Sequence, residues 1–227
     1  MAQTRFDSST PAEAGVYDFA SVIDHSMLRA HEITNLHDQL TEHWHDPSQR
    51  LHIPGGLDDW MRRVALQHRA NFELWHIEDE ARAPGANDAD LANVKRRVDS
   101  TNQRRNDLAE DLDRILLEWL GQRQLPDPSA TLNSESPGLI IDRLSILALK
   151  IYHTREESTR QQAPDGHAER NRHRLAILQE QRFDLAGCLD ALWRDTLGGT
   201  RRFKLYRQLK MYNDPALNPA IYGKAKP

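Results

Sequence analysis

Histidine and acidic residues around position 76 have the types and spacing of a divalent-metal site. His76 and Asp79 lie three residues apart, and His68 precedes His76 by eight, so these side chains can share one helix face. Glu80 follows Asp79 directly. Clustered carboxylates with an imidazole suit Mg²⁺, Mn²⁺ or Fe²⁺. We predict that His76, Asp79 and Glu80 hold Mg²⁺ or Mn²⁺, and that His76 and Asp79 are also catalytic. The alternative is a solvated helix end with internal ion pairs.

Polar residues interrupt the apolar stripe of the next expected helix. Asn102 and Arg105 fall between Val98 and Leu108, at positions where a helical bundle normally carries leucine. A buried amide or charge without a partner is costly, so such residues either pair or line a cavity. We predict Arg105 as a catalytic residue, and Asn102 and the adjacent Asn106 as substrate-binding residues.

A buried ion pair is the other interpretation of Arg105, with Asp79 or Asp142 as its partner. Asp142 lies near the start of an apolar segment, and Lys150 follows eight residues later, about 12 Å along a helix axis. Free N–H groups at the start of this helix offer either an anion site or an ordinary N-cap. We predict that Asp142, Lys150 and the more distant Arg207 bind substrate.

The elements that must position these residues are helices. Steps of three and four between apolar residues continue through most of the chain, and prolines and glycines separate the periodic segments. The expected helices span 17–44, 57–82, 88–120, 138–153 and about 175–197. The fold class we expect is all-α, a single-domain bundle of about five long helices. Residues 138–153 should be central because their apolar side chains cover more than one face.

Two terminal regions flank the expected bundle. We predict a flexible N-terminus over 1–16, the bundle domain over 17–199, and a basic-aromatic C-terminal extension over 200–227 that packs on it. Basic-aromatic segments can bind nucleic acid, and salt-sensitive retention would reveal such binding. The net charge of −4 and the lack of a known RNA or DNA motif argue against that partner. A homo-oligomer stays open.

Composition narrows the class of protein further. The 227 residues contain no apolar run approaching 18 residues, so we expect no membrane span. The first ten residues lack the apolar core of a secretion signal, and we therefore expect a cytoplasmic protein. Cys188 is the single cysteine, which excludes an intrachain disulfide. Its place between Leu185 and Leu192 predicts a core thiol.

Four segments of the chain resemble one bacterial family, domain of unknown function 4254. The resemblance runs from about residue 17 to residue 222. The segments are Glu73–Arg82, Asn102–Asp107, Asn133–Gly138 with Ile141–Ile146, and Lys210–Pro215. The family carries no activity over to this chain. Members of this family often lie near glycosyltransferase genes for surface polysaccharide. The resemblance therefore implies a role in sugar-nucleotide or lipopolysaccharide metabolism.

A weaker likeness is to the all-α nucleoside-triphosphate pyrophosphatases, which hold Mg²⁺ between acidic motifs on two helices. Residues 78–80 would be one such motif, and Asp107, Glu110 and Asp111 the other. The segment 102–107 differs from their second motif, and His76 has no counterpart there. The likeness is one of chemistry rather than kinship.

The sequence therefore suggests a metal-assisted hydrolase or transferase acting on a phosphorylated or nucleotide-linked small molecule. Carboxylate-bound metal can orient water, and Arg105, Lys150 and Arg207 would offset substrate charge. The alternative is a non-catalytic interaction module accessory to glycosyltransferases, whose polar core residues form a structural ion-pair network. An open cavity lined by these groups separates the two hypotheses.

Overall fold

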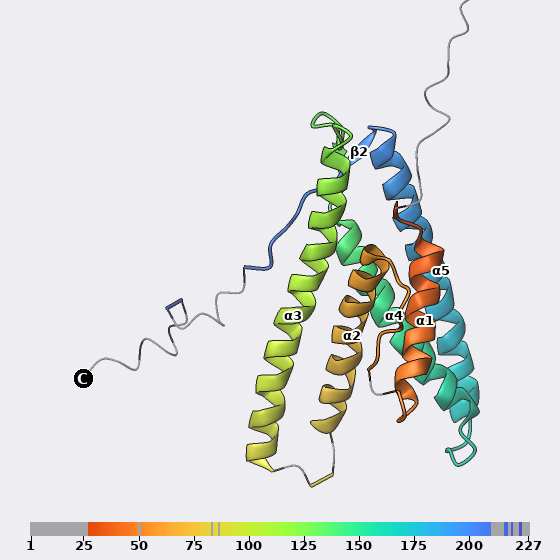
Figure 1. Ribbon diagram of the computed structural model, residues 1–227. Helices are drawn as coiled ribbons and strands as arrows, with labels where there is room; N and C mark the ends of the chain where they lie inside the picture. The colour runs from red at the N-terminus through yellow and green to blue at the C-terminus, as the bar shows by residue number, and fades with distance from the viewer. Residues whose placement is uncertain are drawn as a thin grey trace, which may run out of the picture.

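The described part of the chain folds into a bundle of five helices with one small strand pair (Figure 1). The computed structural model describes residues 27–49, 51–82, 84–85, 87–209, 216–217, 219 and 223. The helices are α1 (Ala30–His45), α2 (Asp59–Glu80), α3 (Asp88–Gly121), α4 (Pro137–Thr159) and α5 (His167–Leu197). The strands are β1 (Thr131–Leu132) and β2 (Arg201–Arg202). The expected all-α bundle with a C-terminal extension is confirmed.

Capping residues explain where the helices begin. The Asp58 carboxylate accepts a hydrogen bond from the N–H of Met61 at the start of α2. Asn87 and Asp90 form a capping box at the start of α3. α5 begins after Gly166, whose positive φ of 71° suits glycine.

Three predicted helix boundaries need comment. α5 begins at His167 rather than near residue 175, because the polar stretch before Leu175 contains good helix formers such as Glu169 and Arg170. α4 continues to Thr159 rather than ending near His153, because Arg155 and Glu156 are good helix formers on its exposed face. α1 begins at Ala30, and residues 17–26 of the first expected helix lie outside the described part of the chain. The expected boundary between residues 16 and 17 lies there too.

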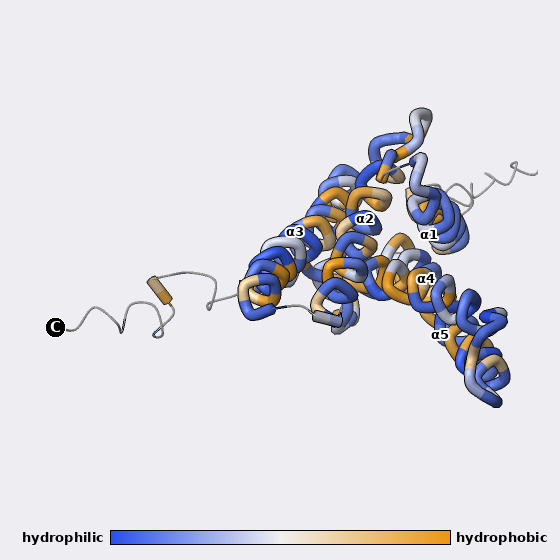
Figure 2. Tube along the Cα trace, turned by 90° about the horizontal axis from the view of Figure 1, so that it is seen from below, coloured by the Kyte–Doolittle hydropathy of each residue, from blue (hydrophilic) through white to orange (hydrophobic). Residues whose placement is uncertain are grey.

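α4 occupies the centre of the bundle, as its apolar sequence predicts. It packs against all four other helices. In Figure 2 its apolar residues lie between α1, α2 and α5. Ile141, Leu144 and Leu149 of α4 are fully or almost fully buried and belong to one continuous core cluster. The side chains of three helices thus meet at α4, which makes it the element that positions a site.

α3 and α4 approach closely at the start of α4. A Cβ added to Gly138 would lie 2.2 Å from the carbonyl oxygen of Ala109, so only glycine fits there. The buried Asp113 carboxylate accepts hydrogen bonds from the Gly138 N–H at 2.6 Å and from the Ser136 hydroxyl. Burial raises the pKa of Asp113 to about 6, with these hydrogen bonds acting in the opposite direction. Asp113 therefore caps α4 from within the protein.

The C-terminal extension is joined to the bundle by the strand pair. β1 and β2 are parallel, with Thr131 opposite Arg201 and Leu132 opposite Arg202. Phe203 directly follows and is 2% exposed. Residues 131–132 were expected to be loop, because a two-residue strand shows no alternating pattern in the sequence. In the described part of the chain, no helix is long and apolar enough to cross a membrane.

Gly138→Ala tests the close approach of α3 and α4. We expect it to lower the free energy of unfolding by about 2–4 kcal/mol, because the new methyl group meets backbone. Gly187→Ala in α5 is the matched control, since nothing lies within 4 Å of its added Cβ. That change should stabilise the helix by about 0.5–1 kcal/mol. Urea unfolding measures both, and equal effects at the two glycines would contradict the packing argument.

Candidate functional site

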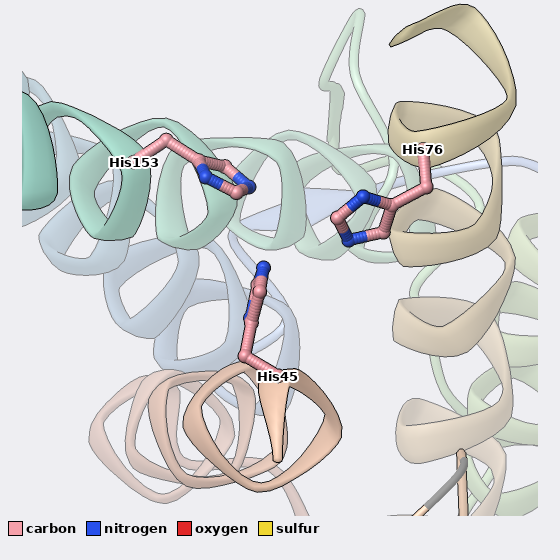
Figure 3. A group of neighbouring side chains, drawn as sticks. All are labelled: His45, His76 and His153. Atoms are coloured by element: carbon pink, nitrogen blue, oxygen red, sulfur yellow. The ribbon is translucent and has the colours of Figure 1, made fainter. Parts of the chain in front are cut away.

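Three histidines from three different helices converge on one space beside α4. His45 is the last residue of α1, His76 lies near the end of α2, and His153 lies in α4. One nitrogen of each ring lies within 4.8 Å of the others. Figure 3 shows the three rings pointing toward one another. Residues far apart in the sequence therefore form a compact imidazole group.

Hydrogen bonds leave one nitrogen lone pair free on two of these rings. The Nδ1 of His45 is 2.6 Å from the carbonyl oxygen of Thr41, to which it must donate its proton. The Nδ1 of His153 is 3.1 Å from the Glu156 carboxylate and donates in the same way. The Nε2 atoms of His45 and His153 are buried and have no hydrogen-bond partner among the residues that the structure describes. Such an arrangement is typical of metal-binding histidines.

The surroundings favour neutral imidazoles. Burial lowers the pKa of His76, and the neighbouring His45 and His153 lower it further. Burial also lowers the pKa of His153, followed by the effect of His45. Glu156, followed by Asp79, opposes the lowering of the His153 pKa, and Asp79, followed by Glu156, opposes that of His76. Neutral imidazole is the form that binds metal ions.

The chemistry of this group fits a transition metal better than Mg²⁺. Three imidazoles with an open position resemble the donor set of catalytic zinc sites, and imidazole also suits iron, copper and nickel. A tetrahedral zinc ion would hold its nitrogen ligands about 3.4 Å apart. Nitrogens up to 4.8 Å apart would therefore move inward by about 1 Å. The two unpartnered Nε2 atoms are the observation that supports the fit.

A fourth histidine, His68, is buried deeper in the bundle and joins the same three helices, α1, α2 and α4, by hydrogen bonds. His68 of α2 is fully buried, with Nε2 2.9 Å from the Thr41 hydroxyl of α1 and Nδ1 2.8 Å from the Ser145 hydroxyl of α4. Burial lowers the pKa of His68 to about 3. Thr41 precedes His45 by one helical turn, and its carbonyl oxygen accepts from the His45 ring. The His68 contacts therefore set the register of the three metal-binding candidates.

Arg105 and Asp142 are neighbours, as one of the sequence interpretations proposed. The Asp142 carboxylate accepts hydrogen bonds from Gln67 at 2.5 Å and Asn71 at 2.9 Å. The Arg105 Nε lies 3.7 Å from the same oxygen and, although buried, has no hydrogen-bond partner. Burial raises the pKa of Asp142 despite these partners. The pair is therefore only partly satisfied.

A cavity of about 460 Å³ opens beside this pair and brings several predicted residues together. Asp79 and Arg105 both line it, so it reaches from the carboxylate beside His76 to the guanidinium beside Asp142. The other lining residues are Asn71, Leu74, Trp75, Glu78, Arg82, Ile146 and Leu149. Trp75 stacks on His153 with ring centroids 4.8 Å apart, which connects the cavity to the histidine group.

The remaining predicted residues are distributed around the bundle. Asn106 is buried and accepts a hydrogen bond from Arg105 at 3.3 Å, whereas Asn102 is half-buried and lines none of the cavities described here. Lys150 is exposed and lines two cavities on the α5 side of α4. Arg207 is exposed on the segment after β2 and lines none of these cavities. The structure thus groups Asp79 with Arg105, and separates Lys150 and Arg207 from them.

The acidic residues of the pyrophosphatase analogy do not meet. The Glu80 carboxylate is bound to Arg97 of α3, and Asp111 of α3 is bound to Arg63 of α2. Arg63 and Glu80 are separated by about 25 Å along α2 at 1.5 Å per residue. The antiparallel packing of α2 and α3 therefore keeps the two motifs apart. Glu80 is engaged with Arg97 rather than directed to the three histidines.

Sequence reasoning missed His45 and His153, although a signal for one of them was present. His153 and Glu156 repeat the His-x-x-acid spacing of His76 and Asp79. That spacing places the carboxylate one turn from the imidazole on the same helix face. His45 has no comparable sequence signal, because its proton acceptor is a backbone carbonyl group.

A comparison with protein families places this arrangement in context. The family described as "Protein of unknown function (DUF4254)" matches residues 61–205. No curated protein and no solved structure matches the chain. The matched span includes His68, His76, Arg105, Asp142 and His153, and His45 lies before it.

The buried histidines predict loss of stability in acid. His68 has a pKa of about 3 when folded and about 6.5 when unfolded, so the unfolded chain binds more protons as the pH falls below 6.5. Between pH 7.5 and 5 this should lower the free energy of unfolding by about 2 kcal/mol. His37, whose pKa burial also lowers, acts in the same direction. Asp113, with its raised pKa, recovers about 1 kcal/mol.

Urea unfolding at several pH values measures this dependence. The midpoint should fall steadily from pH 7.5 to pH 5. Constant or rising stability over that range would contradict the neutral, buried state of His68.

Zinc addition tests the histidine group directly. An ion that binds only the folded protein stabilises it by about 2.7 kcal/mol at one hundred times its dissociation constant. We expect Zn²⁺ to raise the melting temperature of the wild type, and His45→Ala and His153→Ala to remove that rise. His31→Ala is the control, since His31 is exposed on α1 outside the group. The same rise in all variants would show that Zn²⁺ binds elsewhere.

Proposed function

The chain is a member of the DUF4254 family, and we propose that it is a metal-dependent hydrolase or transferase acting on a phosphorylated or nucleotide-linked small molecule. The observation that carries the proposal is the convergence of His45, His76 and His153, two of which present a buried, unpartnered Nε2. This ligand set replaces the sequence-based set of His76, Asp79 and Glu80. It favours Zn²⁺ or another divalent transition metal over Mg²⁺.

Asp79 is the residue we assign as general base. Its carboxylate is exposed, follows His76 by three residues on the same face of α2, and lines the cavity of about 460 Å³. A metal held by His45, His76 and His153 would act as a Lewis acid and activate a water molecule. Asp79 would accept the proton from that water. Arg82 lies 3.8 Å from Asp79 and lines the same cavity.

Arg105 is the residue we assign to the negative charge of the substrate. Its Nε lacks a hydrogen-bond partner, and the side chain lines the same cavity as Asp79. A guanidinium group is well suited to phosphate because its fixed donors match the phosphate oxygens. Asn106 accepts a hydrogen bond from Arg105 and Asp142 lies 3.7 Å away, so both are positioning residues in this proposal.

A structural role is the second candidate, and one observation favours it. Asp142 already receives hydrogen bonds from Gln67 and Asn71, and Arg105 stands beside it. A network of this kind can specify how helices pack without adding much stability. In that case the protein is an interaction module, and the polar residues hold its shape for a partner.

Turnover experiments separate the two candidates. The reaction is release of phosphate or pyrophosphate from a panel of nucleotides and sugar nucleotides, with Zn²⁺, Mn²⁺ or Mg²⁺. We expect activity that requires a transition metal and falls about 100-fold or more in Asp79→Asn. Asp99→Asn is the control, because Asp99 is a half-buried α3 residue that pairs with Lys95 and lines none of the cavities described above.

Melting temperatures of the wild type and the variants show whether a loss of activity comes from lost chemistry or from unfolding. Asp79 is exposed, so its substitution should leave the fold intact. Activity that survives in Asp79→Asn would refute the assigned base. Absence of turnover in a folded, zinc-binding wild type would favour the interaction module.

A further inference from the structure

Two cavities lie along the contact between α4 and α5. The two helices lie side by side in both views (Figures 1 and 2). The larger, of about 930 Å³, extends from the start of α4, and the smaller, of about 360 Å³, borders His153. Lys150 and Gln181 line both cavities. The two cavities are therefore adjacent, and we call them together the α4–α5 groove, whose smaller part borders His153.

The charges in the smaller cavity are not balanced. Glu157 lines it, but its carboxylate is bound to His167 at 2.7 Å and to Arg160 at 3.3 Å. Lys150 and Arg174 also line it, and neither has a carboxylate partner among the described residues. Two unpaired cations therefore face the same small space. That is the charge pattern of a site for an anion.

The larger cavity differs in character. Leu147, Leu185 and Leu192 contribute an apolar floor. At its rim the charges are mostly paired, as in Arg143 with Glu135 at 2.8 Å. This cavity suits the uncharged part of a ligand, since apolar surfaces with a few polar groups are typical of small-molecule sites.

We propose that this groove binds an organic phosphate, with the phosphate group between Lys150 and Arg174 and the organic part along the larger cavity. This groove is a second ligand site on the α5 side of α4, distinct from the cavity in which Arg105 is assigned to the substrate, and it does not rest on that proposed function. The Nη1 of Arg174 donates to Asn171 at 3.3 Å, which directs the guanidinium from the same helix. Trp75, stacked on His153, separates this cavity from the one lined by Asp79.

Cys188 offers a probe at the far part of the groove. The sequence analysis expected a core thiol, but Cys188 is exposed and lines the larger cavity. The expectation was wrong because Cys188 lies on the side of α5 that α4 leaves open. Because it is the single cysteine of the chain, alkylation by N-ethylmaleimide reports on this position alone.

The first measurement is calorimetric binding of adenosine diphosphate in EDTA, with inorganic phosphate and adenosine as partial ligands. We expect the diphosphate to bind the wild type, and Lys150→Gln and Arg174→Gln each to weaken it about tenfold or more. Arg172→Gln is the matched control, because Arg172 is exposed on the same helix and lines neither cavity. Adenosine diphosphate should also slow alkylation of Cys188, whereas inorganic phosphate should not.

The outcomes distinguish this inference from the metal proposal. Binding in EDTA that depends on Lys150 and Arg174 supports the groove even if Zn²⁺ fails to stabilise the protein. No binding of the diphosphate, or equal binding in all variants, refutes the groove even if the zinc shift appears. Melting temperatures of Lys150→Gln and Arg174→Gln confirm that the variants are folded, as expected for residues on the helix surface.

Discussion

The contact on which the rest of the structure depends is the His68 imidazole held between Thr41 and Ser145. It joins α1, α2 and α4 through a buried polar group that cannot exchange its partners for water, so slippage of any helix would leave an unsatisfied nitrogen or hydroxyl. His76 and His153 each lie two turns beyond their own member of this contact, and His45 lies one turn beyond Thr41. Helix register fixed inside the core thus determines what faces the surface.

How much of this could be predicted from the sequence depends on the range of the interaction. The α3 helix was predicted to within one residue, because Pro84 and Gly85 separate it from the preceding helix and its apolar stripe is regular. The Arg105–Asp142 pair was one of two alternatives, since polar residues in apolar stripes must find partners. His45 and the exposure of Cys188 were not predictable, because they depend on which side of one helix another helix covers. No periodicity in a single helix carries that information.

The molecule separates two kinds of polar residue that look alike in the sequence. Gln67 and Asn71 both donate hydrogen bonds to the Asp142 carboxylate in the interior. Lys150 and Arg174 lack carboxylate partners in the described part of the chain and face a cavity. Arg105 stands between the two, with an unpartnered Nε beside a buried carboxylate and a cavity in front. Partner availability, more than burial, distinguishes residues that hold the fold from residues that can meet a ligand.

The Asp113 carboxylate has a consequence for how an anion can be recognised. Aligned peptide dipoles place partial positive charge at the start of α4, where a phosphate would otherwise be attracted. Asp113 already supplies negative charge there through its hydrogen bond to the Gly138 N–H. The end of the helix is therefore electrostatically neutralised from inside. Recognition of an anion on this face must come from long, mobile cationic side chains, which makes it sensitive to ionic strength and tolerant of ligands of different shape.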